Sequence, residues 1–263
     1  MDMDRVRLIK QLAVIALISD DQLLELLVLK GGSAIDLLNP AAGRSSVDID
    51  FSIDGDLEGD AESLRIRFER LLGDAFVPEG FRIFDVRFEP HPQMPTPLLA
   101  FWGGYVLEFK VAEFEVYEKY KNKLERLRKH ATDVGPGTLK TMRIELSKHE
   151  HCEGKQEYEL EGYSIYVYTP LMIACEKLRA ICQQFPEYRE FVKSREPASR
   201  ARDFFDIHYL TEEFDLAWES DETRNMVRAM FAAKHVPLKL LSRISECHDL
   251  QVLQESVWVR LVG

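Results

Sequence analysis

Residues 30–51 read KGGSAIDLLNPAAGRSSVDIDF, and this stretch decides the fold and the chemistry expected of the chain. The glycine pair followed by Ser33 predicts a tight turn whose backbone N–H groups face an anion at a helix N-terminus. Asp48 and Asp50 are separated by one apolar residue, so on a strand both carboxylates project from the same face.

The two halves of this stretch point to one kind of chemistry. Two hard oxygen ligands side by side suit Mg²⁺, which is usually held through carboxylates and shares substrate phosphates. Each half alone is common in surface turns and strands, but their order and helix-length spacing are more specific. A phosphate-binding turn followed by paired carboxylates predicts a nucleotide-transferring enzyme.

Length and composition limit the class of protein. The 263 residues suffice for one large domain or two modest ones, and 46% hydrophobic with 30% charged residues is typical of soluble globular proteins. No apolar run approaches the length of a membrane span, and the N-terminal residues do not resemble a secretory signal. Cys152, Cys175, Cys182 and Cys247 lack CxxC spacing, so we expect thiols in a reducing, cytoplasmic compartment.

The net charge of −11 argues mildly against tight, non-specific binding of nucleic acid. Lysine and arginine nevertheless cluster in residues 119–129 and 193–202. In 119–129 they alternate with Glu118 and Glu125, which favours a solvated helix face with salt bridges over a nucleic-acid site.

Hydrophobic periodicity predicts an α+β fold with a mixed sheet and flanking helices. We expect helices at residues 4–18, after Asp20-Asp21, and at 34–38, 60–76, 115–131, 170–184, 198–213, 221–234 and 236–247. We expect strands at residues 47–53, 81–88, 105–114, 142–147 and 163–168, with a polar connector at 185–200. The pattern predicts a core domain at residues 1–168 and a helical C-terminal domain at 169–263.

The glycine turn and the two aspartates resemble the nucleotidyltransferase superfamily typified by DNA polymerase β, whose mark is G-[GS], a short helix and D-x-D. Within it, the chain resembles the AbiEii/AbiGii toxin-type nucleotidyltransferases. The segments that carry this resemblance are LKGGSA at 29–34, RSSVDIDF at 44–51, EKLRA at 176–180 and RDFFDI at 202–207. They lie in the family's order and span about residues 27–212, so the resemblance implies a polymerase β-like fold.

The resemblance also implies roles for individual residues. Gly31, Gly32 and Ser33 would hold the triphosphate, and Asp48 and Asp50 would hold Mg²⁺, with Mn²⁺ as an alternative ion.

A third carboxylate would complete the metal site and help to deprotonate the acceptor. Glu145, on the predicted strand 142–147, is the preferred residue for this role, and Glu108 is its competitor. Either could instead be an exposed strand acid.

Further downstream, Lys177 would be a phosphate ligand rather than an ordinary solvated lysine. Asp203 would be an active-site acid that positions Lys177 or Arg44, whereas Asp206, on the same helix face, is expected to be structural. Salt bridges to Arg200 and Arg202 are the alternative role for both acids.

Arg44 and Ser46 precede the two aspartates closely enough to face the same pocket, where Arg44 could bind phosphate through two hydrogen bonds. His149 and His151 look like a pair of metal ligands, but at a strand end they are expected to be exposed.

These expectations combine into one hypothesis. The chain would transfer a nucleoside monophosphate from an NTP to an acceptor hydroxyl. The resemblance implies a toxin of a type IV toxin–antitoxin or abortive-infection system, with a cognate antitoxin and tRNA as an acceptor. Two alternatives remain open: a non-toxic enzyme that modifies a protein or small molecule, and a catalytically silent nucleotide-binding or regulatory protein.

Overall fold

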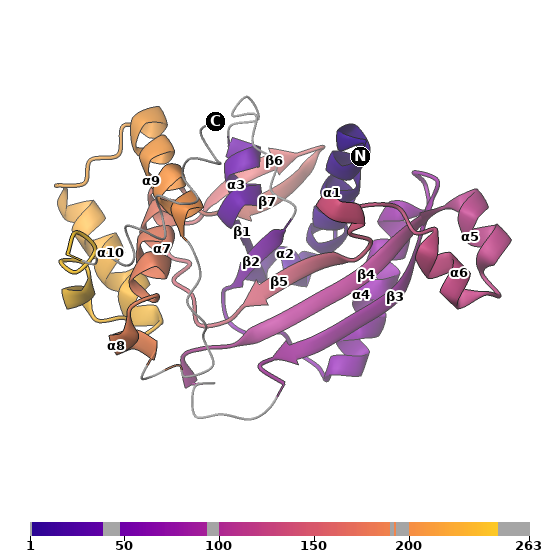
Figure 1. The fold of residues 1–263 in the computed structure, drawn as a ribbon, viewed down its shortest axis with the longest axis horizontal. Coiled ribbons are helices and arrows are strands. Elements are labelled where there is room, and N and C mark those ends of the chain that lie inside the picture. The colour runs from indigo at the N-terminus through magenta and orange to yellow at the C-terminus, as the bar shows by residue number, and fades with distance from the viewer. Residues whose placement is uncertain (1, 39–47, 94–99, 190–191, 193–199, 247–263) are drawn as a thin grey trace. The chain divides into compact units, whose positions relative to one another are not determined.

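The computed structural model describes residues 2–38, 48–93, 100–189, 192 and 200–246, and these residues divide into two compact units. Unit 1 comprises residues 1–99 and 103–167, and unit 2 comprises residues 100–102 and 168–263. Figure 1 labels their helices and strands. No helix among the described residues is long and apolar enough to cross a membrane.

Unit 1 contains one seven-stranded mixed sheet with helices around it. Its strands are β1 (Leu27–Lys30), β2 (Ile49–Ile53), β3 (Phe81–His91), β4 (Gly104–Glu113), β5 (Met142–Ser147), β6 (Gln156–Leu160) and β7 (Tyr163–Val167). Its helices are α1 (Met3–Ile18), α2 (Asp21–Leu26), α3 (Gly31–Leu38), α4 (Ala61–Phe76), α5 (Phe114–Tyr120) and α6 (Leu124–Lys129), with a 3₁₀ turn at Pro136–Thr138. The α+β prediction is confirmed.

The strand order is β3-β4-β5-β2-β1-β7-β6. β2 pairs in parallel with β5, and β1 pairs in parallel with β7, whereas the other neighbours are antiparallel. The strand that carries Asp50 therefore lies at the centre of the sheet, between β1 and β5. A central strand is held by backbone hydrogen bonds on both sides, so it fixes the side chains it carries.

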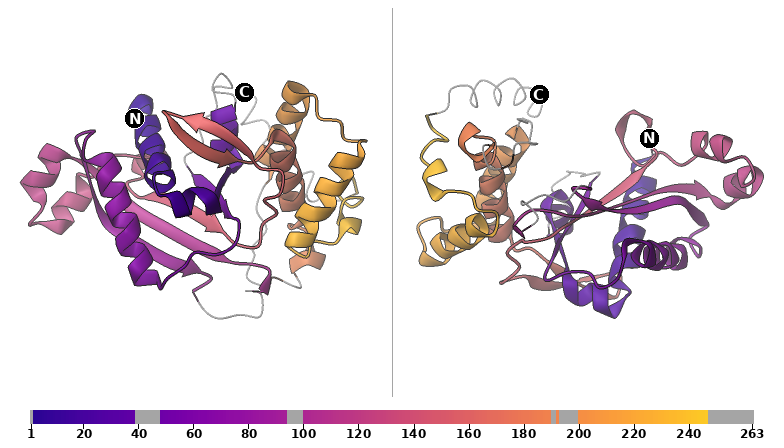
Figure 2. Two further views of the ribbon diagram at one scale, coloured as in Figure 1. Left: turned by 180° about the vertical axis from the view of Figure 1, so that it is seen from behind. Right: turned by 90° about the horizontal axis from the view of Figure 1, so that it is seen from below.

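One face of the sheet is covered by α1 and α4, as the view from behind in Figure 2 shows. The contact includes aromatic pairs: the Phe68 ring lies 5.0 Å from that of Phe88, and the Phe76 ring lies 5.8 Å from that of Phe109. All four side chains are buried, and each contributes about 1.5–3 kcal/mol through the hydrophobic effect. This layer anchors the strands that carry the candidate site on their other face.

Short polar side chains begin several of these helices. The Asp20 carboxylate accepts hydrogen bonds from the N–H groups of Gln22 and Leu23, and Asp60 does the same at the start of α4. Such caps satisfy backbone donors that have no partner inside the helix. They explain why α2 and α4 begin where the sequence predicts.

The single helix predicted at residues 115–131 is wrong, because the chain forms two short helices, α5 and α6, with a break at residues 121–123. The break lets Leu127 and Ala131 turn back and pack on Phe84 and Ala112 of the sheet. A continuous helix over this segment would run about 25 Å in one direction and could not fold back on itself in this way.

Among the described residues beyond 168, the regular elements of unit 2 are all helices. It contains α7 (Pro170–Cys182), α8 (Pro186–Arg189), α9 (Ala201–Phe214), α10 (Asp221–Ala233) and a 3₁₀ turn at Leu238–Leu240. The Thr169 hydroxyl caps α7 by accepting from the N–H of Met172, as the Thr-Pro pair predicts.

The helix predicted at 236–247 is wrong over its described part, which forms only turns that follow Pro237. The predicted connector at 185–200 also needs correction, since it contains α8.

Candidate functional site

The glycine turn begins α3 directly after β1. Gly31 has a left-handed backbone with φ of +63°, a conformation that residues with a Cβ rarely adopt. A Cβ placed there would lie 3.0 Å from Oδ2 of Asp50. Glycine thus allows the carboxylate of Asp50 to pack against the start of α3.

Ser33 joins the same two segments. Its hydroxyl donates a 2.7 Å hydrogen bond to the backbone carbonyl of Asp48, and its side chain is almost buried. Asp48 is exposed and Asp50 is half-buried. The structure therefore brings Gly31, Ser33, Asp48 and Asp50 together. The Ser33 hydroxyl fixes the backbone of Asp48, the residue that precedes β2.

Strand register brings the third predicted acid beside them. Asp50 and Glu145 are direct partners on the parallel strands β2 and β5, so their side chains leave the same face of the sheet. That face, here called the polar face, lies opposite α1 and α4. One row of paired residues across it consists of Lys30, Asp50, Glu145, Val106 and Glu89.

Arg143 links the two candidates for the third carboxylate. Its Nε donates to Oε1 of Glu145 at 3.0 Å, and its Nη1 lies 3.2 Å from Oε1 of Glu108. Glu145 is 48% exposed and Glu108 is 32% exposed, so both remain accessible to a substrate. Only Glu145 is paired with Asp50, which favours it for chemistry that involves the aspartates.

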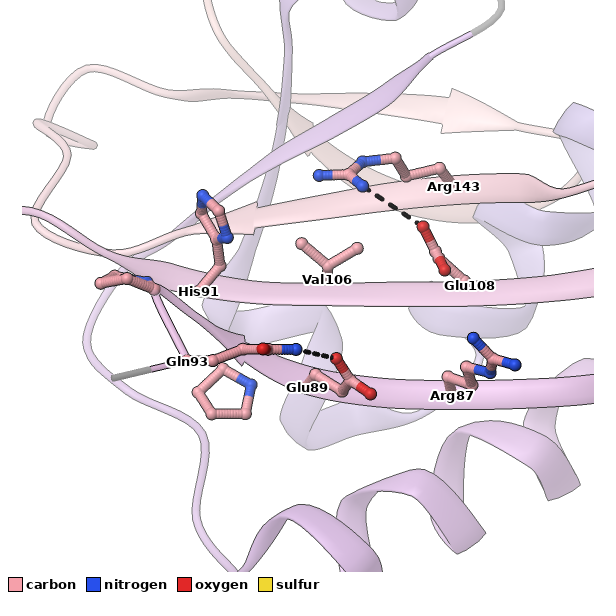
Figure 3. A pocket seen from close by; sticks show the side chains of 9 residues that line it. Arg87, Glu89, His91, Gln93, Val106, Glu108 and Arg143 are labelled. Carbon is pink, nitrogen blue, oxygen red and sulfur yellow. Dashed lines mark hydrogen bonds and ion pairs between the residues drawn. The ribbon is translucent and has the colours of Figure 1, made fainter. Parts of the chain in front are cut away.

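A pocket of about 460 Å³ lies on the polar face next to Glu145. Its lining residues come from β3, the segment that follows it, β4 and β5: Arg87, Glu89, Pro90, His91, Pro92, Gln93, Val106, Glu108 and Arg143. Figure 3 shows the contact between Arg143 and Glu108 and the hydrogen bond from Gln93 to Glu89. The pocket has the volume typical of small-ligand sites.

Two lysines that the sequence did not single out lie near the aspartates. Lys10, on α1, forms an ion pair with Asp36 at 3.5 Å and is electrostatically coupled to Asp48 and Asp50. Burial lowers the pKa of Lys10, although these carboxylates oppose that effect. The sequence signal that could have identified Lys10 is its place within the apolar pattern of the first helix.

Lys30 is the second such residue, and it is the direct partner of Asp50 on β1. Its Nζ lies 3.4 Å from Oε1 of Glu150, with side-chain exposures of 8% and 3%. Buried charges are retained in pairs because an unpaired one is costly to desolvate. The segment with His149 and His151 thus supplies a buried carboxylate to the polar face through Glu150.

A divalent ion needs several oxygen, nitrogen or sulfur donors gathered around it. Among the described residues, no three His, Cys, Asp or Glu side chains are gathered closely enough to hold a metal ion. Asp48 and Asp50 still offer two oxygen donors at one strand, and Mg²⁺ is commonly bound by one or two carboxylates together with substrate phosphates. The residues fit a metal that arrives with a phosphate-bearing substrate.

In unit 2, the predicted pair Lys177 and Asp203 is in direct contact. The Nζ of Lys177 lies 3.1 Å from Oδ1 of Asp203 and 2.6 Å from Oδ2 of Asp206. Arg200 contacts the other oxygen of Asp203 at 3.3 Å. Asp206 is only 1% exposed, so it holds the ammonium from the interior while Asp203 holds it nearer the surface.

Two predicted site residues, Arg44 and Ser46, lie outside the described residues. The cysteines of α7 take no part in the site, since burial raises the pKa of both the Cys175 and the Cys182 thiols to about 12. Thiols held neutral in this way are poor nucleophiles and poor metal ligands.

The protein family of the chain follows from its match to a known family model. The chain matches the family model described as "Nucleotidyl transferase AbiEii toxin, Type IV TA system" over residues 13–258. The chain belongs to the AbiEii family. It is a nucleotidyltransferase, and the resemblance carried by the four sequence segments is confirmed.

The comparison with solved structures finds a crystal structure of an antigenic nucleotidyltransferase-like protein from Paracoccidioides brasiliensis. It is 14% identical, with a TM-score of 0.40, and the alignment covers 89% of this chain and 92% of that chain. No curated protein matches the AbiEii-family chain significantly.

Proposed function

We propose that this AbiEii-family enzyme transfers a nucleoside monophosphate from an NTP to an acceptor hydroxyl, with Mg²⁺ held by Asp48 and Asp50. The observation that carries the proposal is the packing of Gly31 against Asp50, which is itself paired with Glu145. The side chains of Asp50 and Glu145 thus leave the same face of the sheet, with the start of α3 packed against Asp50. A bound Mg²⁺ would neutralise charge on the triphosphate.

The chain's own residues have separate tasks in this proposal. The backbone at the start of α3, at Gly31, Gly32 and Ser33, binds the terminal phosphates. The acceptor oxygen forms a bond to the α-phosphorus, the bond from that phosphorus to the bridging oxygen breaks, and pyrophosphate leaves. Glu145 accepts the proton of the acceptor hydroxyl. Glu108 is the alternative base, and Arg143 contacts both carboxylates.

We further propose that residues 169–263 form a C-terminal domain that contributes Lys177 to the triphosphate, with Asp203 as its positioning residue. The contact between Lys177 and Asp203 supports this pairing. Arg44 and Ser46 complete the proposed nucleotide contacts from the segment before Asp48.

The test uses purified protein, Mg²⁺ and each labelled NTP in turn, with total RNA and total protein supplied as acceptors. Asp48→Asn and Asp50→Asn are expected to lower transfer by roughly a hundredfold or more, the scale on which one charge-stabilising group affects kcat. Asp74→Asn, an exposed aspartate on α4, is the matched control. Absence of both nucleotide binding and transfer by the wild type would overturn the proposal.

We propose that the enzyme acts as the toxin of a type IV toxin–antitoxin system in the cytoplasm, with tRNA among its acceptors and a cognate antitoxin as its partner. Family membership supports this role. Induced expression should arrest growth, and Asp48→Asn should abolish the arrest. Transfer activity without arrest would instead identify a non-toxic modifying enzyme, and arrest that persists in Asp48→Asn would contradict the link between toxicity and transfer.

A further inference from the structure

The pocket on the polar face adjoins the proposed catalytic base. Val106, in its floor, is the direct partner of Glu145, and Arg143 precedes Glu145 by two residues on the same face of β5. The pocket is lined by β3, β4 and β5, and β5 also carries Glu145. A molecule in the pocket would lie beside Glu145, on the side away from β1 and the glycine turn.

The chemistry of the lining indicates what the pocket would hold. Arg87 and Glu108 are direct partners on β3 and β4, and Arg143 and Glu108 are direct partners on β4 and β5. Two guanidinium groups thus flank one carboxylate across three strands (Figure 3). A guanidinium presents a planar fork of donors that matches the oxygens of a phosphate.

Arg87 is exposed, and no hydrogen bond or ion pair of its side chain occurs among the described residues. Arg143 contacts the carboxylates of both Glu108 and Glu145 within 3.2 Å. Arg87 is thus the first contact for an incoming anion, and Arg143 is a group that can exchange a carboxylate partner for it.

We propose that this pocket is the acceptor subsite, and that Arg87 and Arg143 bind a phosphate group carried by the acceptor. The inference rests on the proposed transfer reaction, since it assigns that reaction a substrate class. A volume of about 460 Å³ suits one nucleotide or a sugar phosphate. The acceptor is thus either the end of a nucleic acid strand or a free sugar phosphate.

This assignment gives Arg143 a positioning role. In the absence of acceptor it holds Glu145 by a 3.0 Å hydrogen bond. A phosphate that binds the Arg143 guanidinium in place of Glu145 leaves the Glu145 carboxylate available to accept the hydroxyl proton. Acceptor binding and activation of the base are thereby coupled through one side chain.

The test measures binding of two probes to the full chain: a short, fluorescently labelled single-stranded RNA with a free 3′ hydroxyl, and ribose 5-phosphate. Arg87→Ala should weaken binding roughly tenfold to a hundredfold, as expected for loss of a charge-assisted hydrogen bond. For the RNA, it should also reduce the slope of log affinity against log salt concentration by about 0.7. Arg87→Lys should recover part of the salt slope but less of the affinity, since lysine lacks the fork.

Arg70→Ala is the matched control, because Arg70 is an exposed arginine on α4, which covers the opposite face of the sheet. NTP binding is measured on every variant and should not change. Binding of the RNA alone identifies a nucleic acid acceptor, and binding of both probes identifies the phosphate itself as the determinant.

The inference is overturned if neither probe binds the wild type, or if Arg87→Ala binds as tightly as Arg70→Ala. Label transferred from NTP to protein rather than to a phosphate-bearing acceptor would also overturn it. In each of these outcomes the wild type would still bind NTP and transfer nucleotide. If the proposed function fails, the wild type would do neither.

Discussion

The replacement of Gly31 by alanine tests whether the glycine turn and Asp50 form one site. Two effects act on the variant. The backbone φ of +63° costs a residue with a Cβ about 1–2 kcal/mol. The added methyl group would also lie 3.0 Å from Oδ2 of Asp50, so the carboxylate must move by a few tenths of an ångström.

Two other glycines separate these effects. Gly80 has φ of +81° with no atom within 4 Å of an added Cβ, so Gly80→Ala carries the backbone cost alone. Gly73 lies inside α4, also with open space around its Cβ position, and alanine there should stabilise the fold by about 0.5–1 kcal/mol. Gly73→Ala should therefore be more stable than the wild type, and Gly80→Ala should be less stable than the wild type. Gly31→Ala should be as unstable as Gly80→Ala or more so.

Urea unfolding measures the stabilities, and metal-dependent NTP binding and transfer measure the site. Since a 1 Å misplacement of a reacting group can cost about a hundredfold, a smaller shift of Asp50 should lower transfer by roughly tenfold in Gly31→Ala. Gly80→Ala should retain wild-type transfer. The reasoning is refuted if Gly31→Ala transfers nucleotide as fast as Gly80→Ala, because Asp50 would then tolerate displacement.

Two further predictions concern charged clusters. Lys177→Met removes the cation that contacts the buried carboxylate of Asp206 and should destabilise the fold by about 3–5 kcal/mol in urea, with much of the loss recovered in the double variant that adds Asp206→Asn. Equal stability of the single variant and the wild type would contradict a paired, buried Lys177. Burial alone would raise the pKa of Asp56, but hydrogen bonds from Lys148 and Tyr105 lower it. Its contribution to stability is thus present above the unfolded value of about 3.9 and is lost as pH falls through the lower folded value. Lys148→Met should reduce this acid-dependent loss by under about 1 kcal/mol, since Asp56 is half-exposed, and an unchanged pH profile of urea unfolding would count against the pairing.

Much of the fold could be predicted from sequence because its signals are local. The alternation of Met142, Ile144 and Leu146 sets which side of β5 carries Glu145, since strand periodicity assigns every second residue to one face. Helix caps such as Asp20 and Thr169 act within a few residues of the backbone they satisfy. These features need no knowledge of distant contacts.

The features that sequence reasoning missed depend on pairing between distant segments. β6 went unpredicted because it is an edge strand with largely exposed side chains on both faces, so its residues show no apolar alternation. The contact of Arg143 with Glu108 exists only because β4 and β5 are neighbours in one register. The positions of Lys10 and Lys30 near the aspartates likewise follow from strand order and helix packing.

The assignment of Ala100–Trp102 to unit 2 has a practical consequence for anyone who wishes to produce the units separately. The chain leaves the sheet after β3, contributes these three residues to unit 2, and returns for β4. The Phe101 ring stacks on His235 with 4.2 Å between ring centroids. A fragment that ends at Val167 would carry Phe101 without its neighbours, and a fragment that begins at Tyr168 would lack it. Dividing the chain at one position therefore does not yield two complete units, and co-expression of both fragments is the better starting point.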